Sequence, residues 1–144
     1  MSVAAQALDA LAAIVGAALS CPCTITGAPP SPTAAPCPSA WLSYETIRAD
    51  VDGPGVALSQ RGLTMAVRVT IYPQTTDATP RGRLLAVLGA ADRVVSAVHA
   101  DRGLGGLVLD CLASHDAPPP DVGASGGLQA EIAIEVRWIG GDSL

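Results

Sequence analysis

The sequence predicts an α+β fold in which a mostly antiparallel sheet packs against two helices, in the order helix, two strands, helix, two strands. Two observations carry this prediction. Residues 63–73 and 128–138 each alternate apolar and polar side chains, the pattern of a strand with one buried face and one face left for water or a neighbouring subunit. Between them lies a stretch whose apolar residues recur at helical spacing.

The composition is that of one small domain with few aromatic residues. The 144 residues suffice for a single domain over 1–144 that needs neither disulfides nor metal to fold. Phenylalanine is absent and only two tryptophans and two tyrosines occur, so the core must consist mainly of Ala, Val, Leu and Ile. Scarce aromatics disfavour stacking on single-stranded nucleic acid, and a net charge of −5 disfavours wrapping of DNA.

The first twenty residues predict a helix of the domain. Ser2 can cap this helix, and its apolar side chains recur at three- and four-residue steps: Leu8, Leu11, Ile14, Val15 and Leu19. The segment is too short to span a membrane, and it lacks the basic stretch of a lipoprotein signal although Cys21 follows it. We therefore expect a cytoplasmic chain with no membrane partner.

Residues 21–40 predict an extended arm, because they hold six of the twelve prolines. Residues 24–26 can form at most a short edge strand there. Residues 41–50 predict the first main strand, with Leu42, Tyr44 and Ile47 as its apolar side chains. The turn-rich residues 51–62 then favour antiparallel pairing with the strand that follows.

The second helix begins at Thr79 and Pro80, a favourable cap and first-turn pair, and we expect it to end at Gly103. Its predicted buried stripe is Leu84, Leu88, Ala91, Val95 and Val98. Residues 103–116 predict a strand with alternating Leu107, Leu109 and Cys111, although residues 107–112 could instead form a helical turn. Residues 117–127 predict a flexible loop.

The two alternating strands assign their side chains to opposite faces. The side predicted to be buried carries Leu63, Met65, Val67, Val69 and Ile71 in the first strand, and Leu128, Ala130, Ile132, Ile134, Val136 and Trp138 in the second. The charged residues of the other side are candidates for contacts between subunits: Arg68, Glu131, Glu135 and Arg137.

The sequence offers no metal, cofactor or catalytic site. Structural zinc prefers two to four residues between paired ligands, a spacing that the cysteines lack (Cys21, Cys23, Cys37 and Cys111). A disulfide within residues 21–37 stays open if the protein meets an oxidising environment. Glu131 and Glu135 lie roughly 13 Å apart on a strand, too far for a paired acid and base.

The histidines and glycines also favour structural roles. His99 lies near a helix end, where an imidazole can donate a hydrogen bond to the last backbone carbonyls of the helix. His115 is expected to be solvated. Residues 103–106 follow a helix rather than a strand and lack a Lys-Ser/Thr pair, so they predict a tight turn and not a phosphate loop. We therefore expect that the protein is not an enzyme.

Three segments carry a resemblance to a known family. They are PSAWLSYE (38–45), AVHADRGLGGLVLDCLASHD (97–116) and LQAEIAIEVRW (128–138). Their layout resembles the tail terminator proteins of long-tailed phages, also called minor tail or tail completion proteins. The family pattern of a helix ending in an acidic residue, then Leu-Gly-Gly and a strand, is matched by Asp101, Leu104, Gly105 and Gly106. Residues 21–37 depart from that pattern.

The resemblance implies a structural virion protein, assembled in the host cytoplasm and located at the head-proximal end of the tail. It implies a hexameric homo-oligomer ring that caps the tail tube and stops tube polymerisation. The implied partners are the major tail tube protein and a head-tail stopper or other neck protein, and genomic DNA passes the channel without specific binding. Two alternatives stay open: a head-tail stopper or other neck connector, and a small α+β module that binds a ligand or a protein.

Overall fold

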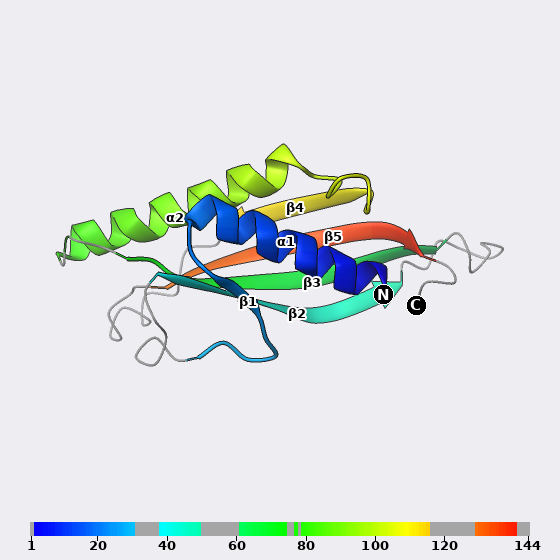
Figure 1. Ribbon diagram of the computed structural model, residues 1–144, viewed down its shortest axis with the longest axis horizontal. Coiled ribbons are helices and arrows are strands. Elements are labelled where there is room, and N and C mark those ends of the chain that lie inside the picture. The colour runs from blue at the N-terminus through cyan, green and yellow to red at the C-terminus, as the bar shows by residue number, and fades with distance from the viewer. Residues whose placement is uncertain are drawn as a thin grey trace.

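The computed structural model describes residues 2–30, 38–49, 61–74, 77, 79–115 and 129–140. Both helices lie on one side of a five-stranded sheet, so the protein has two layers (Figure 1). The elements in chain order are α1 (Val3–Leu19), β1 (Cys23–Ile25), β2 (Ser39–Ala49), β3 (Arg61–Tyr72), α2 (Pro80–Ala100), β4 (Asp110–His115) and β5 (Ala130–Gly140).

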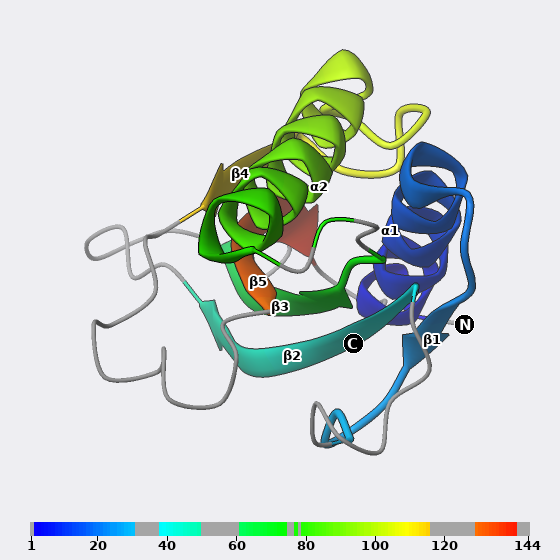
Figure 2. The ribbon, with the colours of Figure 1, turned by 90° about the vertical axis from the view of Figure 1, so that its left-hand side faces the viewer.

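The sheet has the strand order β1-β2-β3-β5-β4. The pairs β2–β3, β3–β5 and β4–β5 are antiparallel, and only the short edge strand β1 pairs in parallel. In the helix layer, α2 lies over β4 and β5, and α1 lies toward β1 (Figure 2). The predicted α+β fold with a mostly antiparallel sheet is therefore confirmed. The short edge strand allowed at residues 24–26 is present as β1, one residue earlier in the chain.

The strands β3 and β5 supply the centre of the core. The described residues that were predicted to be buried on these strands are each 5% exposed or less: Leu63, Met65, Val67, Val69, Ile71, Ala130, Ile132, Ile134, Val136 and Trp138. Leu128 lies outside the described residues. The two strands pair over eleven register positions, from Arg61 opposite Gly140 to Ile71 opposite Ala130. This pairing brings both apolar faces to the helix side.

Helix α1 begins at the predicted cap, but the row of side chains that it buries differs from the predicted one. The Ser2 hydroxyl accepts a hydrogen bond from the Ala5 backbone N–H at 3.1 Å, which satisfies one of the unpaired donors of the first turn. The buried side chains are Ala4, Ala7, Leu11 and Val15, while Leu8, Ile14 and Leu19 are only partly buried. No helix in the described part of the chain is long and apolar enough to span a membrane.

Helix α2 begins at the predicted cap. The Thr79 hydroxyl accepts from the Gly82 N–H at 3.1 Å and donates to the Asp77 carboxylate at 2.7 Å. The hydrogen bond from Thr79 holds the pKa of the Asp77 carboxyl below its ordinary value. The helix ends at Ala100, with Asp101 as its cap, three residues before the expected end.

The predicted buried stripe of α2 is partly wrong. Ala91 and Val98 are buried and Val95 is partly buried, but Leu84 is 53% exposed and Leu88 is 46% exposed. The line that faces the sheet instead contains Val87, Ala90, Ala91, Val94 and Val98. Two apolar lines lie side by side on this helix, and periodicity alone cannot decide between them. The line of small and β-branched side chains is the one that is buried.

The strand predicted over residues 103–116 is also shorter than expected, because β4 begins only at Asp110. Residues 101–109 form turns in which Leu104, Gly105 and Gly106 have positive φ angles. Leu107 is consequently only partly buried and Leu109 is exposed. The alternative of a helical turn at 107–112 is wrong as well. The expected turn residues 51–60 and the expected loop 117–127 lie outside the described residues.

Three aromatic side chains of the sheet differ in their hydrogen bonds. The Tyr72 hydroxyl at the end of β3 donates to the Pro30 carbonyl at 2.6 Å, which holds the arm after β1 beside the sheet. Trp41 on β2 donates its indole N–H to the Ser39 hydroxyl at 3.1 Å. Trp138 on β5 is buried, and its indole N–H has no hydrogen-bond partner among the described residues.

We expect Ile134→Ala to lower the free energy of unfolding by about 2 to 5 kcal/mol, because it leaves a cavity in the centre of the core. Chemical denaturation followed by circular dichroism measures the change. The matched control is Glu135→Ala on the opposite face of the same strand, which should change stability by less than about 0.5 kcal/mol. Equal losses in the two variants would contradict the observed facing of β5.

Candidate functional site

The face of the sheet opposite the helices is the candidate functional site, and we call it the open face. The described residues place no helix over it (Figure 1). All four charged residues that the sequence analysis singled out lie on this face and are exposed: Arg68 on β3, and Glu131, Glu135 and Arg137 on β5. The alternation of both strands and their register bring the four residues to one surface.

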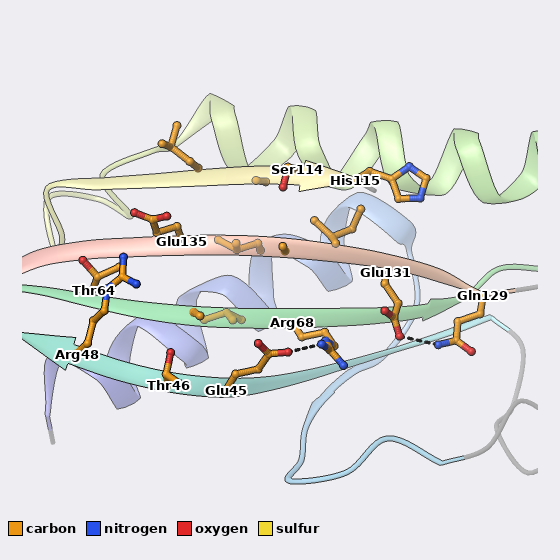
Figure 3. A pocket seen from close by; sticks show the side chains of 17 residues that line it. Glu45, Thr46, Arg48, Thr64, Arg68, Ser114, His115, Gln129, Glu131 and Glu135 are labelled. Carbon is orange, nitrogen blue, oxygen red and sulfur yellow. Dashed lines mark hydrogen bonds and ion pairs between the residues drawn. The ribbon is translucent and has the colours of Figure 1, made fainter. Parts of the chain in front are cut away.

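The open face is hollowed along its middle, with a cavity volume of about 740 Å³ (Figure 3). The short side chains of Ala66 on β3 and Ala133 on β5 line the hollow, and their methyl groups leave space between longer neighbours. Register places Ala66 opposite Glu135 and Ala133 opposite Arg68, so small and charged residues alternate across the two central strands. Leu112 on β4 adds an exposed apolar side chain to the lining.

Glu45 contributes to the open face although sequence reasoning did not select it. The register between β2 and β3 shifts between Tyr44 and Thr46, which marks a β-bulge at this residue. Alternation from the buried Leu42 already places Glu45 on the open face, where it pairs with Arg68 across the two strands (Figure 3). The bulge brings Thr46 and Arg48 to the same face.

The carboxylates of the open face differ in their partners. Glu131 accepts a hydrogen bond from the Gln129 amide at 2.9 Å, and Glu45 is paired with Arg68. The side chain of Glu135 forms no hydrogen bond or ion pair with any described residue. Glu131 has only a neutral amide as its partner, so Glu131 and Glu135 both carry a negative charge that no cation among the described residues pairs with, and both favour a cationic partner.

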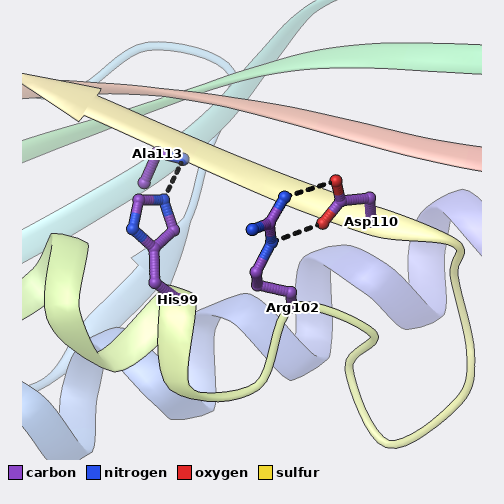
Figure 4. A network of polar contacts seen from close by, with 4 residues as sticks. All are labelled: His99, Arg102, Asp110 and Ala113. Atoms are coloured by element: carbon purple, nitrogen blue, oxygen red, sulfur yellow. Dashed lines mark hydrogen bonds and ion pairs between the residues drawn. The ribbon is translucent and has the colours of Figure 1, made fainter.

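The outer edge of β4 is covered by side chains from the end of α2 (Figure 4). His99 Nε2 accepts from the backbone N–H of Ala113 at 3.0 Å. Arg102 donates two hydrogen bonds of 2.7 Å to the Asp110 carboxylate. This hydrogen bonding from Arg102 holds the pKa of Asp110 below its ordinary value, and the Cys111 N–H contributes in the same direction. Occupied N–H donors make an edge strand a poor template for another strand.

The outcome differs for the two histidines. His99 has a structural role, as expected, but its partner is a strand N–H rather than the late carbonyls of its own helix. His115 was expected to be solvated, and it is only partly exposed. It lies at the end of β4, and its Nε2 atom is buried with no hydrogen-bond partner among the described residues.

The described cysteines are thiols in partly or fully buried positions. Burial raises the pKa of Cys23 and Cys111 to about 11. Burial also raises the pKa of Cys21, and the nearby Arg93 opposes that shift. Cys37 lies outside the described residues. In the described part of the chain, no three His, Cys, Asp or Glu side chains gather in a way that could hold a metal ion.

Comparisons with known proteins give a similarity to a solved structure but none to a family model or a curated sequence. No protein-family model matches the chain, and no curated protein matches its sequence. Among solved structures, the chain is similar to the sheath/tube terminator of an extracellular contractile injection system, PVC, in its extended state. The TM-score is 0.49 and the sequence identity is 14%. The similarity covers 93% of this chain and 55% of that chain, so this chain spans about half the length of that structure.

We expect Cys23 to react slowly with iodoacetamide. At pH 7.5 its raised pKa makes the thiolate fraction about 100-fold smaller than in the unfolded chain. The rate is measured by mass spectrometry on the Cys21→Ser, Cys37→Ser variant, with the same chain in urea as reference. The thiol ionises more readily in the unfolded chain. The contribution of Cys23 to the free energy of unfolding should therefore be fully present below pH 9.0 and be lost as the pH rises toward 11. Equal rates in the folded and unfolded chains would contradict this expectation.

We expect His99→Ala to expose the edge of β4. The Ala113 N–H loses its acceptor, so its hydrogen exchange should accelerate and the free energy of unfolding should fall by about 0.5 to 1.5 kcal/mol. Amide exchange followed by NMR measures the first effect and denaturation the second. His115→Ala serves as the control and should leave exchange at Ala113 unchanged. Unaltered exchange in His99→Ala would show that the edge is protected by other means.

Proposed function

We propose that the protein is a structural tail component of the terminator type, which self-associates into a ring at the head-proximal end of a phage tail tube. The observation that carries the proposal is the open face, a hollowed and charged sheet surface that the protein's own helices leave uncovered. A surface of this kind gains stability when a partner of complementary shape and charge covers it. The proposed role is structural and not enzymatic.

The three segments of the family resemblance give further support. PSAWLSYE leads into and forms the first half of β2, and LQAEIAIEVRW contains most of β5. AVHADRGLGGLVLDCLASHD runs from the last turn of α2 through β4. The segments therefore belong to elements that build the open face and its edge. We infer from the resemblance that the ring is hexameric, that it ends tube polymerisation, and that it offers a docking face to the neck.

The charge of the protein suits such a ring. The basic residues are all arginines, which pair with carboxylates through two parallel hydrogen bonds and are favoured at contacts between subunits. The chain carries a net charge of −5, so a channel lined by several copies would repel the phosphates of passing DNA. We accordingly place the protein in the virion tail, after assembly in the host cytoplasm. A head-tail stopper shares these properties, and its position in the particle distinguishes it.

A second candidate function is the binding of a small molecule in the hollow. The volume of about 740 Å³ lies within the range of about 300 to 1,000 Å³ that is typical of ligand pockets. This candidate predicts a monomer or dimer in solution, whereas the terminator predicts a ring. The mass of the purified protein in solution therefore separates the two candidates.

We expect the purified chain to form a ring of about six copies, or to join one on tail tubes, and Glu135→Arg to weaken that assembly while folding normally. The reversed charge disturbs a contact between subunits more than it disturbs an exposed strand position. Light scattering and electron-microscope class averages measure ring formation, and added tail tubes test capping. The control is Asp9→Arg, an equal change of charge at an exposed position on α1. A strictly monomeric chain that also fails to cap tubes would refute the proposal.

A further inference from the structure

Helix α2 exposes three leucines on its outer side. Leu84, Leu85 and Leu88 lie within the first half of the helix, and each is about half exposed. The exposed Arg81 precedes them by three, four and seven residues, which places it on the same side of the helix. We call Leu84, Leu85 and Leu88 the leucine patch. Exposed apolar side chains grouped in this way are typical of a surface that contacts another molecule.

The hollow of the open face has the complementary shape and chemistry. The leucine patch stands on a convex helix, whereas the hollow is concave and is lined by the methyl groups of Ala66 and Ala133. Leu112 extends this apolar lining toward β4. A row of leucines can enter a groove between small side chains, much as helix ridges enter grooves in helix packing.

One charge beside each of the two surfaces is complementary to the other. Arg81 is the cation at the N-terminal end of the leucine patch, and the exposed Asp92 lies on the same side of the helix four residues after Leu88. The charged groups that line the hollow are Glu45, Arg48, Arg68, Glu131 and Glu135. Glu45 and Arg68 neutralise each other, which leaves two glutamates against one arginine and a net negative charge. Glu135 is the glutamate without a partner among the described residues, so it is the natural counterpart of an incoming Arg81.

We infer that the leucine patch of one copy seats in the hollow of a second copy, with Arg81 beside Glu135. This inference rests on the proposed function, because it names the two surfaces that meet in the ring. The patch and the hollow lie on opposite sides of the sheet (Figures 1 and 3). Each contact therefore leaves one patch and one hollow available, and head-to-tail contacts of this kind close into a ring when their rotation fits.

The β4 edge of the sheet disfavours pairing with a strand of a second copy. The Ala113 N–H on this outer edge already has a partner in His99, and an occupied donor makes an edge strand a poor template. At the other edge β1 pairs with β2 only at residues 40–42, so β2 beyond Leu42 has no second neighbouring strand among the described residues. A second copy therefore gains more from the hollow than from the β4 edge.

Disulfide trapping tests the contact. The variant that carries both Leu85→Cys and Ala133→Cys, with serine in place of Cys21, Cys23 and Cys37, should give a ladder of linked dimers, trimers and higher species on mild oxidation. A non-reducing gel measures it. Either new cysteine alone should give no ladder. Linked dimers from Leu85→Cys alone would mean that two patches meet, and linked dimers from Ala133→Cys alone would mean that two hollows meet. Either result overturns the inference.

Two controls keep this test decisive. Leu109→Cys combined with Ala133→Cys places the first thiol on an exposed loop outside the patch and should not give a ladder. If the first double variant unfolds, Leu88→Cys with Ala66→Cys probes the same contact at a second pair of positions. Circular dichroism and thermal melting identify the variants that fold as the parent does.

Charge reversal tests the same contact without new bonds. Arg81→Glu and Glu135→Arg should each weaken assembly by about tenfold or more, since each places like charges side by side. The double variant restores the pair with reversed polarity and should assemble within about threefold of the parent. Sedimentation at several concentrations measures the three proteins. If the double variant loses as much assembly free energy as the two single variants together, the pairing of Arg81 with Glu135 is overturned.

The outcomes separate the contact from the function. If the parent forms rings that cap tubes but the double-cysteine variants give no ladder, the inference is wrong and the proposed function stands. If the ladder forms and charge reversal is rescued, but the rings fail to cap tubes, the contact is right and the proposed function is wrong. If the parent stays monomeric at every concentration and no ladder forms, both are overturned.

Discussion

The pairing of β3 with β5 is the constraint on which the rest of the structure depends. These two strands run antiparallel over eleven register positions at the centre of the sheet, and each buries alternate residues against the helices. A slip of one residue in β5 would exchange each of its buried side chains for an exposed one. It would bring Glu131, Glu135 and Arg137 beneath the helices, so the hydrophobic core and the charged open face are specified by the same register.

Much of the architecture follows from local pattern. The apolar alternation of β3 and β5 predicted their buried faces correctly, and Ser2 and Thr79 marked the starts of both helices. The strand order did not follow from local pattern. The last strand inserts between β3 and β4, and nothing in its own sequence distinguishes that place from an edge, because the preference arises from burial of the whole face by distant segments.

The errors have physical causes at particular residues. On α2 the periodicity allowed two adjacent apolar lines, and packing selected the smaller one, which left Leu84 and Leu88 exposed. Positive φ angles at Leu104, Gly105 and Gly106 delayed β4 until Asp110. Of the candidate site, the outward charges were predictable from alternation, whereas the hollow depends on neighbours in four strands. The bulge that brings Thr46 and Arg48 to this face disturbs the period by a single residue, which is too weak a signal to interpret alone.

The two tryptophans lie on opposite faces of the same sheet. Trp138 is buried on the helix side, whereas Trp41 lies opposite Thr70 on the open face and is only partly covered. An indole in an apolar interior emits at shorter wavelength than one that meets water. Since the chain contains only these two indoles, its intrinsic fluorescence combines one signal that changes when the core opens and another that changes when the outer surface is covered. Each face of the protein thus carries its own optical reporter, without any label.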